Sequence, residues 1–405
     1  MAVNLPELPS LHPITGIKIG TACAKIKQAQ HDDLALFELS SQSTCAAVFT
    51  RNVFCAAPVT IAKQHLITTS PRFLLVNSGN ANAGRGEHSL NDALDCCEEV
   101  AQLTGCTKSE VLPFSTGVIG VPLPVEKIRS ALPTTLTTLD VQGWEKAAKA
   151  IMTTDTVPKG TSVQVSIEGQ PIRVTGIAKG SGMIRPDMAT MLAFIATDAV
   201  VPIPVLQACL NHAVNQSFNR ITVDGDTSTN DACVLIATGE GQRVIDSINH
   251  PAFAPFCQAV TDVCLQLAQA IIRDAEGATK FITLSVEQGA SQQECLDLAY
   301  TIAHSPLVKT AFFASDANWG RILAAIGRSG LENLDIHTVK IYLGDVCIVK
   351  NGGVSKDYTE EKGQKIMREP EILVRVLLER GDYQETIFTS DLSHDYVRIN
   401  AEYRT

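Results

Sequence analysis

The sequence predicts a mixed α/β protein with internal sheets, because short apolar runs alternate along it with segments of helical periodicity. Hydrophobic residues make up 45% of the 405 residues and charged residues 19%, which supplies a sizeable core and is far from the composition of a disordered chain. A chain of this length is expected to form two or three domains. No internal repeat, low-complexity tract or linker marks a boundary between them.

The first clear strand and helix lie between residues 73 and 105. The apolar run Phe73–Val76 leads into the turn-rich stretch NSGNANAG at 77–84, which predicts a strand running into a loop. A helix is expected from about Asn91 to Thr104, where apolar residues recur every three or four positions. Gly105 follows at the position of a C-terminal cap.

A second strong helix is predicted from about Phe256 to Ala275, with one apolar face and Gly277 as its end. The sequence after residue 339 is rich in strand signals. The runs 339–343 and 346–349 flank a Gly-Asp pair, which indicates a hairpin, and apolar residues alternate over 372–376. The C-terminal part of the chain is therefore expected to be β-rich.

Charge and cysteine spacing exclude several classes of partner. The formal net charge is −10, and no cluster of lysine and arginine reverses it locally, so nucleic acid is not an expected partner. Twelve cysteines and nine histidines are scattered without a C-x-x-C or H-E-x-x-H motif, and no metal site is expected. Free, mostly buried thiols suit a reducing compartment.

The chain is expected to be cytoplasmic and soluble. Its start, MAVNLPELPSLHPITG, has neither the basic and apolar regions of a secretory signal nor the arginine-rich character of a transit peptide. No stretch approaches the roughly 20 apolar residues of a transmembrane helix.

The segment from Ala178 to Asp198 has two halves of opposite character. Up to Pro186 it is loop material with two glycines, and from Met188 to Ala196 it is apolar except for Thr190. A continuous apolar run bounded by turn signals predicts a strand that is buried on both faces. In the simplest interpretation Thr190 is structural, with its hydroxyl bonded to a main-chain carbonyl.

The alternative makes Thr190 a nucleophile. A threonine hydroxyl needs a base beside it, and cutting the Ala189–Thr190 bond would give Thr190 a free α-amine. Such amines titrate near ~7.7–8.0, so a sizeable share is neutral and able to accept the hydroxyl proton. The preceding Gly/Pro loop would allow the strained peptide that an N-to-O acyl shift requires. The local pattern alone leaves both interpretations open.

A family resemblance favours the nucleophile. The segment KGSGMIRPDMATML at 179–192 resembles the self-cleavage site of the ornithine acetyltransferase (glutamate N-acetyltransferase) family of arginine biosynthesis. Further blocks across nearly the whole chain resemble the same family in the same order: NSGNANAG at 77–84, PFSTGVIG at 113–120, IMTTDT at 151–156, VDGDTSTND at 223–231, RDAEGATK at 273–280, SDANWGRI at 315–322 and NAEYRT at 400–405.

The resemblance implies a fold and a reaction. The fold would be a stacked αββα sandwich reminiscent of N-terminal nucleophile hydrolases, with a smaller β-rich C-terminal portion. Self-cleavage would give an α fragment, 1–189, and a β fragment, 190–405, assembled as α2β2. Acetyl would pass by ping-pong transfer from N-acetylornithine through Thr190 to glutamate, without a further cofactor. Some members also take acetyl from acetyl-CoA, and no sequence element decides this here.

The resemblance also assigns an oxyanion hole to the Thr116 hydroxyl and the Gly117 backbone N–H, which both donate hydrogen bonds. The sequence pattern alone predicts an ordinary strand-to-loop turn at residues 115–118, with a capping hydroxyl. Lys179 would pair with a substrate carboxylate, whereas a lysine is usually a solvated surface charge.

Glu276 is expected at the C-terminal end of a helix, where the helix dipole disfavours an anion by about 0.3–1 kcal/mol. A carboxylate at such a position suggests a binding role, and the resemblance assigns it to the amine-bearing end of the substrate. The nearby Lys280 could instead simply neutralise it.

The remaining substrate-binding residues come from the block at 151–156 and from the C-terminus. Thr153 is preferred over Thr154, although the sequence leaves both open. Asn400 and Thr405 would close over the substrate, whereas terminal residues are usually frayed. Three further polar residues can equally be turn formers and are left out of the site: Asp226, Asn230 and Asn318.

Two other functions are compatible with the same residues. The first is a hydrolase, an aminopeptidase or amidase in which water rather than an amine resolves the acyl-enzyme. The second is a non-catalytic α/β binding protein in which Thr190 is a core residue.

Overall fold

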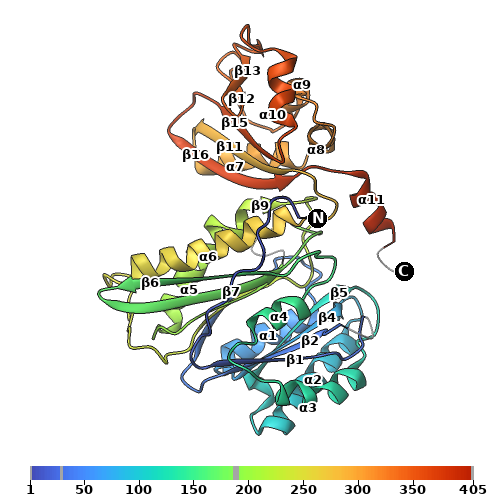
Figure 1. Cartoon of the computed structure of the whole chain (residues 1–405), viewed down its shortest axis with the longest axis vertical. Helices are drawn as coiled ribbons and strands as arrows, with labels where there is room; N and C mark the ends of the chain where they lie inside the picture. The colour runs from blue at the N-terminus through green and yellow to red at the C-terminus, as the bar shows by residue number, and fades with distance from the viewer. Residues whose placement is uncertain (1, 28–30, 186–190, 403–405) are drawn as a thin grey trace. The chain divides into compact units, whose positions relative to one another are not determined.

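The computed structural model describes residues 2–27, 31–185 and 191–402. The chain forms two compact units. The larger unit consists of Pro6–Asn219 and Asp226–Ile271, and the smaller of Met1–Leu5, Arg220–Gly225 and Ile272–Thr405. Each unit has its own hydrophobic core, and Figure 1 labels many of the elements of both.

The larger unit contains two sheets. The first has the order β1-β2-β4-β5, with β4 and β5 parallel and the other neighbours antiparallel. The second has the order β3-β10-β8-β7-β6, with β8 and β10 parallel and the other neighbours antiparallel. The strands are β1 (Ile17–Ala22), β2 (Leu34–Leu39), β3 (Thr44–Phe49), β4 (Phe73–Asn80), β5 (Val111–Val118), β6 (Lys159–Ile167), β7 (Gln170–Lys179), β8 (Leu192–Thr197) and β10 (Ala232–Ala237).

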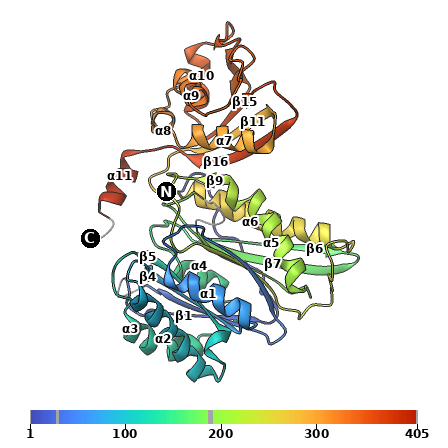
Figure 2. The same cartoon turned by 180° about the vertical axis from the view of Figure 1, so that it is seen from behind.

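The two sheets of this unit pack face to face. The ring of Phe194 on β8 lies 5.1 Å from that of Phe37 on β2 and 5.2 Å from that of Phe114 on β5. The other face of the first sheet packs against α2 and α3. The second sheet is covered by α5 and α6, and a Cβ at Gly176 of β7 would touch Val263 and Leu267 of α6. Figures 1 and 2 show α5 and α6 running along this sheet. The resulting α–β–β–α order confirms the fold class that the family resemblance implies.

The helices of the larger unit are α1 (Ala57–Thr68), α2 (Glu87–Thr104), α3 (Val125–Thr137), α4 (Trp144–Ala150), α5 (Ile203–Gln216) and α6 (Phe253–Arg273), with two 3-10 turns, η1 (Lys108–Glu110) and η2 (Phe218–Arg220), the second of which runs into the smaller unit. Among the described helices, only α6 is long and apolar enough to span a membrane, and 67% of its apolar window is buried inside the protein. By length and composition α6 thus differs from the sequence-based expectation that no stretch approaches such a span, but its burial is typical of a core helix.

The smaller unit is built on a seven-stranded sheet with the order β14-β13-β12-β15-β11-β16-β9. Its strands are β9 (Ile221–Thr222), β11 (Phe281–Gly289), β12 (Lys340–Leu343), β13 (Val346–Lys350), β14 (Gly353–Val354), β15 (Glu371–Leu377) and β16 (Tyr383–Ser390). Its helices are α7 (Gln292–Ala303), α8 (Pro306–Phe313), α9 (Trp319–Gly327), α10 (Glu360–Met367) and α11 (His394–Ala401). This unit is the β-rich C-terminal portion that the sequence predicts.

Several predicted elements are confirmed. Helix α2 ends at Thr104, and Gly105 caps it with a φ of 75°. Strands β12 and β13 form the predicted antiparallel hairpin. In β15, Ile372, Val374 and Val376 are all buried, and the residues between them are exposed or half-buried. All twelve cysteines are free thiols, and most of them are buried.

Other boundaries differ from the predicted ones. Helix α6 ends at Arg273 rather than near Ala275, so Glu276 lies in the turn that follows the helix. Strand β4 continues to Asn80 through residues that the sequence assigns to a loop, because β5 pairs with it along its whole length. Strand β8 begins only at Leu192, and Met191 forms a bend before it. As predicted, β8 is fully buried between two neighbouring strands.

Candidate active site

Thr116 lies near the end of β5, where it is buried and touches a lysine from the other sheet. The Lys179 ammonium, at the last position of β7, donates a hydrogen bond to Thr116 Oγ1 over 3.2 Å. These two residues are 63 positions apart in the chain, and the packing of the two sheets brings them together. The predicted oxyanion residue and the predicted carboxylate-binding residue are therefore neighbours.

Gly117 occupies a position that no other residue fits. Its φ is 133°, and a Cβ built on it would lie 2.3 Å from the carbonyl carbon of Gly79 and 2.5 Å from the nitrogen of Asn80. Only glycine allows the ends of β4 and β5 to approach so closely. The sequence-based interpretation of residues 115–118 as a simple turn is wrong, because β5 stays paired with β4 as far as Val118.

Asp155 connects two parts of the site. One carboxylate oxygen accepts hydrogen bonds from Lys159 Nζ at 2.6 Å and from the Gly180 nitrogen at 2.8 Å, and the other accepts from the Thr153 nitrogen at 3.0 Å. Burial raises the pKa of Asp155, but the cations of Lys159 and Lys179 and the hydrogen bonds outweigh it and hold that pKa well below its usual range. An ionised Asp155 thus holds both Thr153 and Gly180, the first residue of the loop after β7.

Lys27 is a candidate site residue that the sequence does not mark. Its ammonium donates to the main-chain carbonyl of Thr153. Burial lowers the pKa of Lys27, the nearby Asp155 carboxylate opposes this, and the Lys179 cation adds to it. No motif marks Lys27, because its partner lies 126 residues further along the chain.

Asn230 also belongs to this group, although the sequence allows it to be a turn former. Its side-chain amide donates to the carbonyls of Ala81 at 2.6 Å and Ser115 at 2.9 Å. It therefore ties the segment before β10 to the strand that carries Thr116. In the sequence, the one sign that Asn230 is more than a turn former is its position in the family block at 223–231.

Asp231 is a buried acid beside Asn230. Burial raises its pKa well above the usual range, although a hydrogen bond from Ser228 and the Lys179 cation oppose this. Within the part of the chain that the structure describes, Asp231 Oδ2 has no hydrogen-bond partner.

Three predicted site residues, Ala189, Thr190 and Thr405, lie outside the described residues. Met191, which follows Thr190 in the chain, is described and buried. Its carbonyl accepts a hydrogen bond from the nitrogen of Ala232 at 3.0 Å, so the entry to β8 lies against the start of β10.

Glu276 and Asn400 form a second group, in the smaller unit. Glu276 is buried, and the Asn400 side-chain amide donates to its Oε2 over 2.7 Å. Lys280 does not neutralise Glu276, because its ammonium donates to the two main-chain carbonyls of residues 368–369 at 3.0 Å each. Within the described ranges, no lysine or arginine forms an ion pair with Glu276.

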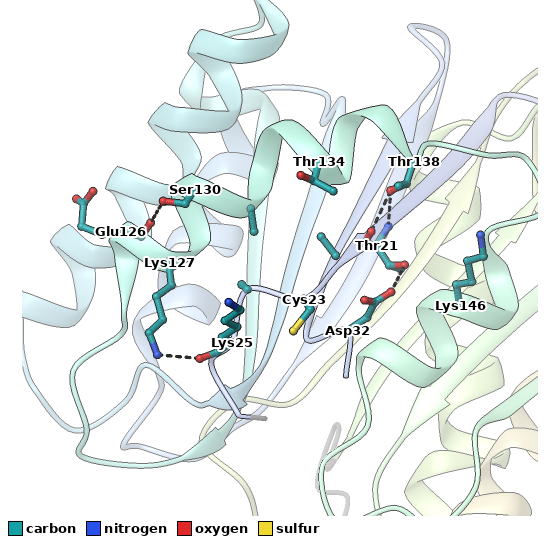
Figure 3. Close-up of a pocket in the computed structure, with 13 residues that line it drawn as sticks. Thr21, Cys23, Lys25, Asp32, Glu126, Lys127, Ser130, Thr134, Thr138 and Lys146 are labelled. Atoms are coloured by element: carbon teal, nitrogen blue, oxygen red, sulfur yellow. Dashed lines mark hydrogen bonds between the residues drawn. The ribbon is translucent and has the colours of Figure 1, made fainter. Parts of the chain in front are cut away.

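A separate open cavity of about 860 Å³ lies in the larger unit, beside β1 and α3. Figure 3 shows Lys127 reaching the carbonyl of Lys25 and the Thr21 hydroxyl reaching Asp32. The cavity contains none of the predicted site residues. It is lined by Thr21, Ala22, Cys23, Ala24, Lys25, Asp32, Glu126, Lys127, Ser130, Ala131, Thr134, Thr138 and Lys146.

Across residues 2–27, 31–185 and 191–402, no group of three or more His, Cys, Asp or Glu side chains could hold a metal ion.

Comparison with known proteins identifies close relatives. The ArgJ family model matches residues 18–405. The chain is 55% identical, over all of both chains, to the arginine biosynthesis bifunctional protein ArgJ of Pseudomonas syringae pv. tomato. It is 57% identical to the protein of that name from Methylococcus capsulatus, over 99% of this chain and 98% of the relative. The crystal structure of arginine biosynthesis bifunctional protein argJ from Bacillus halodurans matches with 42% identity and a TM-score of 0.50, covering 52% of this chain and 99% of the solved one.

Proposed function

The chain belongs to the ArgJ family of arginine-biosynthesis proteins, and from this premise we propose that it transfers acetyl from N-acetylornithine to glutamate through Thr190. The observation that carries the proposal is the contact of Lys179 with Thr116 beside the constrained Gly117. The Thr116 hydroxyl and the Gly117 N–H are two hydrogen-bond donors, and Lys179 is a cation beside them. Such a group can stabilise the oxyanion that develops during acyl transfer.

Self-cleavage creates the nucleophile. The Thr190 hydroxyl oxygen attacks the carbonyl carbon of Ala189, the C–N bond breaks, and the hydroxyl proton goes to the new amine. Water then hydrolyses the resulting ester and leaves Thr190 as the first residue of the second fragment. Its free α-amine, with a pKa near ~7.7–8.0, serves as the base for the later reaction.

Acetyl transfer follows in two steps. Thr190 Oγ attacks the acetyl carbonyl of N-acetylornithine, and its proton passes to the α-amine and on to the departing nitrogen of ornithine. The amine of glutamate then attacks acetyl-Thr190 and regenerates the hydroxyl. In both steps the Thr116 hydroxyl and the Gly117 N–H donate to the oxyanion.

Lys179 supports this chemistry in two ways. Because Lys179 donates to Thr116 Oγ1, the hydroxyl proton of Thr116 points away from Lys179 and is free to bond the oxyanion. Its positive charge also attracts the carboxylate that both N-acetylornithine and glutamate carry. Thr153 binds the same end of the substrate, and its main chain is held by Lys27 and Asp155. Thr154 remains the alternative to Thr153.

Glu276 binds the side-chain ammonium of ornithine, the one amine that N-acetylornithine leaves charged. Its carboxylate is buried with an amide as its hydrogen-bond partner, so a substrate cation would supply the counter-charge. Asn400 orients this carboxylate, and the same proposal assigns Thr405 to substrate binding.

The proposal extends to partners and location. Because its relatives are named bifunctional, we include acetyl-CoA as a second acetyl donor, with no other cofactor. The solved relative's chain is covered almost completely by about half of this chain, which supports division into the fragments 1–189 and 190–405. Assembly of these fragments as α2β2 in the cytoplasm belongs to the same proposal.

The test is to incubate the purified protein with N-acetylornithine, with and without glutamate, and to measure ornithine and N-acetylglutamate. A transferase releases ornithine in step with N-acetylglutamate and only slowly without glutamate. Release at the same rate without glutamate would mean that water resolves the acyl-enzyme and that the protein is a hydrolase. No release under either condition would refute both.

A further inference from the structure

The turn that carries Glu276 is held from one side by the segment that follows β16. Asp391 accepts hydrogen bonds from the nitrogens of Thr279 at 2.8 Å and Lys280 at 3.0 Å, and from the Thr279 hydroxyl at 2.5 Å. Ser393 donates to the carbonyl of Gly277 at 2.6 Å. Main-chain groups one, three and four residues after Glu276 are thus fixed by this segment.

The turn has little freedom to adopt another shape. Gly277 has a φ of 67°, and a Cβ built there would lie 2.6 Å from both Ser393 Oγ and the nitrogen of Tyr396. The close approach requires glycine and presses the turn against the start of α11. Asn400, one turn of α11 further on, reaches Glu276 itself.

Asp391 is buried, with 3% of its surface exposed, and a buried carboxylate needs compensation. The buried ammonium of Lys309 on α8 supplies part of the counter-charge for Asp391. Lys309 Nζ donates to Thr389 Oγ1 at 3.0 Å and to the carbonyl of Ser390, and its own carbonyl accepts from the nitrogen of Leu392. Burial lowers the pKa of Lys309 to about 8, and the carboxylates of Asp391 and Asp224 oppose this.

We propose that Asp391 is a positioning residue for Glu276: by holding the turn through three hydrogen bonds, it sets where the carboxylate meets the substrate's side-chain ammonium. This inference rests on the proposed function, since it assumes that Glu276 binds that amine. Asp391 acts only through Glu276 and touches no reacting atom. Its loss should therefore weaken recognition of the amine more than it slows the chemistry.

The test uses Asp391→Asn in the full chain. The amide is neutral and has a donor in place of one carboxylate oxygen, so the charge-assisted bonds to the turn weaken and the Thr279 hydroxyl loses its acceptor. We expect KM for N-acetylornithine to rise by about 10- to 100-fold, with a much smaller change in kcat and unchanged self-cleavage. Asp395→Asn is the matched control, because Asp395 lies four residues on, is exposed, and pairs with Arg398 rather than with the turn.

Two readouts separate positioning from general damage. The first is preference for N-acetylornithine over N-acetylnorvaline, which lacks only the side-chain amine; Asp391→Asn should reduce this preference and Asp395→Asn should not. The second is a double-mutant cycle, in which Asp391→Asn should add little to Glu276→Gln. If Asp391→Asn folds poorly, Thr279→Val, which removes the hydroxyl that donates to Asp391, should show the same loss of preference on a smaller scale.

An unchanged preference in both Asp391→Asn and Thr279→Val, or fully additive effects with Glu276→Gln, would overturn the positioning role. Wild-type protein measured in the same assay separates this outcome from failure of the proposed function. If the wild type transfers acetyl and prefers the amine-bearing substrate, a negative result counts against Asp391 alone. If the wild type transfers nothing, the proposed function itself fails.

Discussion

At the residue scale, the site depends on one close approach between two sheets. Lys179 donates to the hydroxyl of Thr116, and Gly117 lies against the end of β4 without room for a side chain. Each contact joins residues far apart in the chain, so the geometry exists only in the folded protein. A hydroxyl that accepts from an ammonium has its own proton available for a developing anion.

Thr116→Ala should slow acetyl transfer by about 10²–10³ in kcat, the usual cost of losing one oxyanion donor. KM for N-acetylornithine should change much less, because the lost hydrogen bond strengthens only when charge develops on the carbonyl oxygen. Thr116→Ser keeps the hydroxyl and is the matched control. Steady-state kinetics decide the matter: a rise in KM with unchanged kcat would mean that Thr116 binds substrate instead.

The family blocks contain most of the candidate site residues, but they do not mark Lys27 or show what Asn230 contacts. Both act through hydrogen bonds to main-chain carbonyls more than 100 residues away. Composition and periodicity report only on near neighbours along the chain, so they carry no signal for such contacts. A block that resembles a family marks a residue as important without saying what it touches.

At the element scale, Asp155 joins the loop after α4, strand β6 and the loop after β7 through one carboxylate. Its partner Lys159 is equally buried, and neither side chain is exposed. Removing one member of a buried ion pair leaves a charge without its counter-charge, which typically costs about 3–5 kcal/mol.

Asp155→Asn should therefore lower the thermal unfolding temperature strongly. The double variant Asp155→Asn with Lys159→Met removes both charges and should recover much of that loss. Differential scanning calorimetry of the two variants checks this. Equal destabilisation of the single and double variants would show that the hydrogen bonds to Thr153 and Gly180, not the charge balance, dominate the contribution of Asp155.

Helix α11 is the second element with a predicted effect. Deleting residues 400–405 should leave self-cleavage intact, because that step depends on the loop and strand around Thr190. Transfer should nevertheless collapse, since Asn400 orients Glu276 by a direct hydrogen bond. The steady-state rate with N-acetylornithine and glutamate, beside a denaturing gel, measures both. A cleaved and fully active truncated protein would remove Asn400 and Thr405 from the site.

The class and order of the elements could be predicted from sequence better than their ends. The polar run at 77–80 looks like a loop, yet it continues β4 because its side chains find buried partners. Asn77 accepts from the Ser115 hydroxyl at 2.6 Å, and Ser78 donates to the carbonyl of Ala150 at 2.7 Å. Such tertiary partners override local turn propensity, and they are invisible to a window of neighbouring residues.

At the scale of the whole molecule, the proposed cut does not coincide with the boundary between the two compact units. Cleavage after residue 189 would place β3, β6 and β7 in the first fragment and β8 and β10 in the second. These strands interleave in one sheet with the order β3-β10-β8-β7-β6. The buried strand pairs would therefore hold the two fragments together after the peptide bond is broken.

The cleaved protein should accordingly elute from a gel-filtration column as one species that contains both fragments. In denaturant sufficient to unfold the sheets, the same sample should separate into two. Fragments that part in native buffer would contradict the interleaved arrangement, because separation would require several buried strand pairs to break.

Intact-mass spectrometry after a short incubation with N-acetylornithine and no glutamate tests the assignment of Thr190 most directly. The expected spectrum contains two fragments, of which the one beginning at Thr190 is heavier by one acetyl group, and glutamate added before quenching removes that group. Thr190→Ala should remain a single uncleaved chain without acetyl. A Thr190→Ala protein that is still cut, or an acetyl group on a different residue, would place the nucleophile elsewhere and contradict the proposed function.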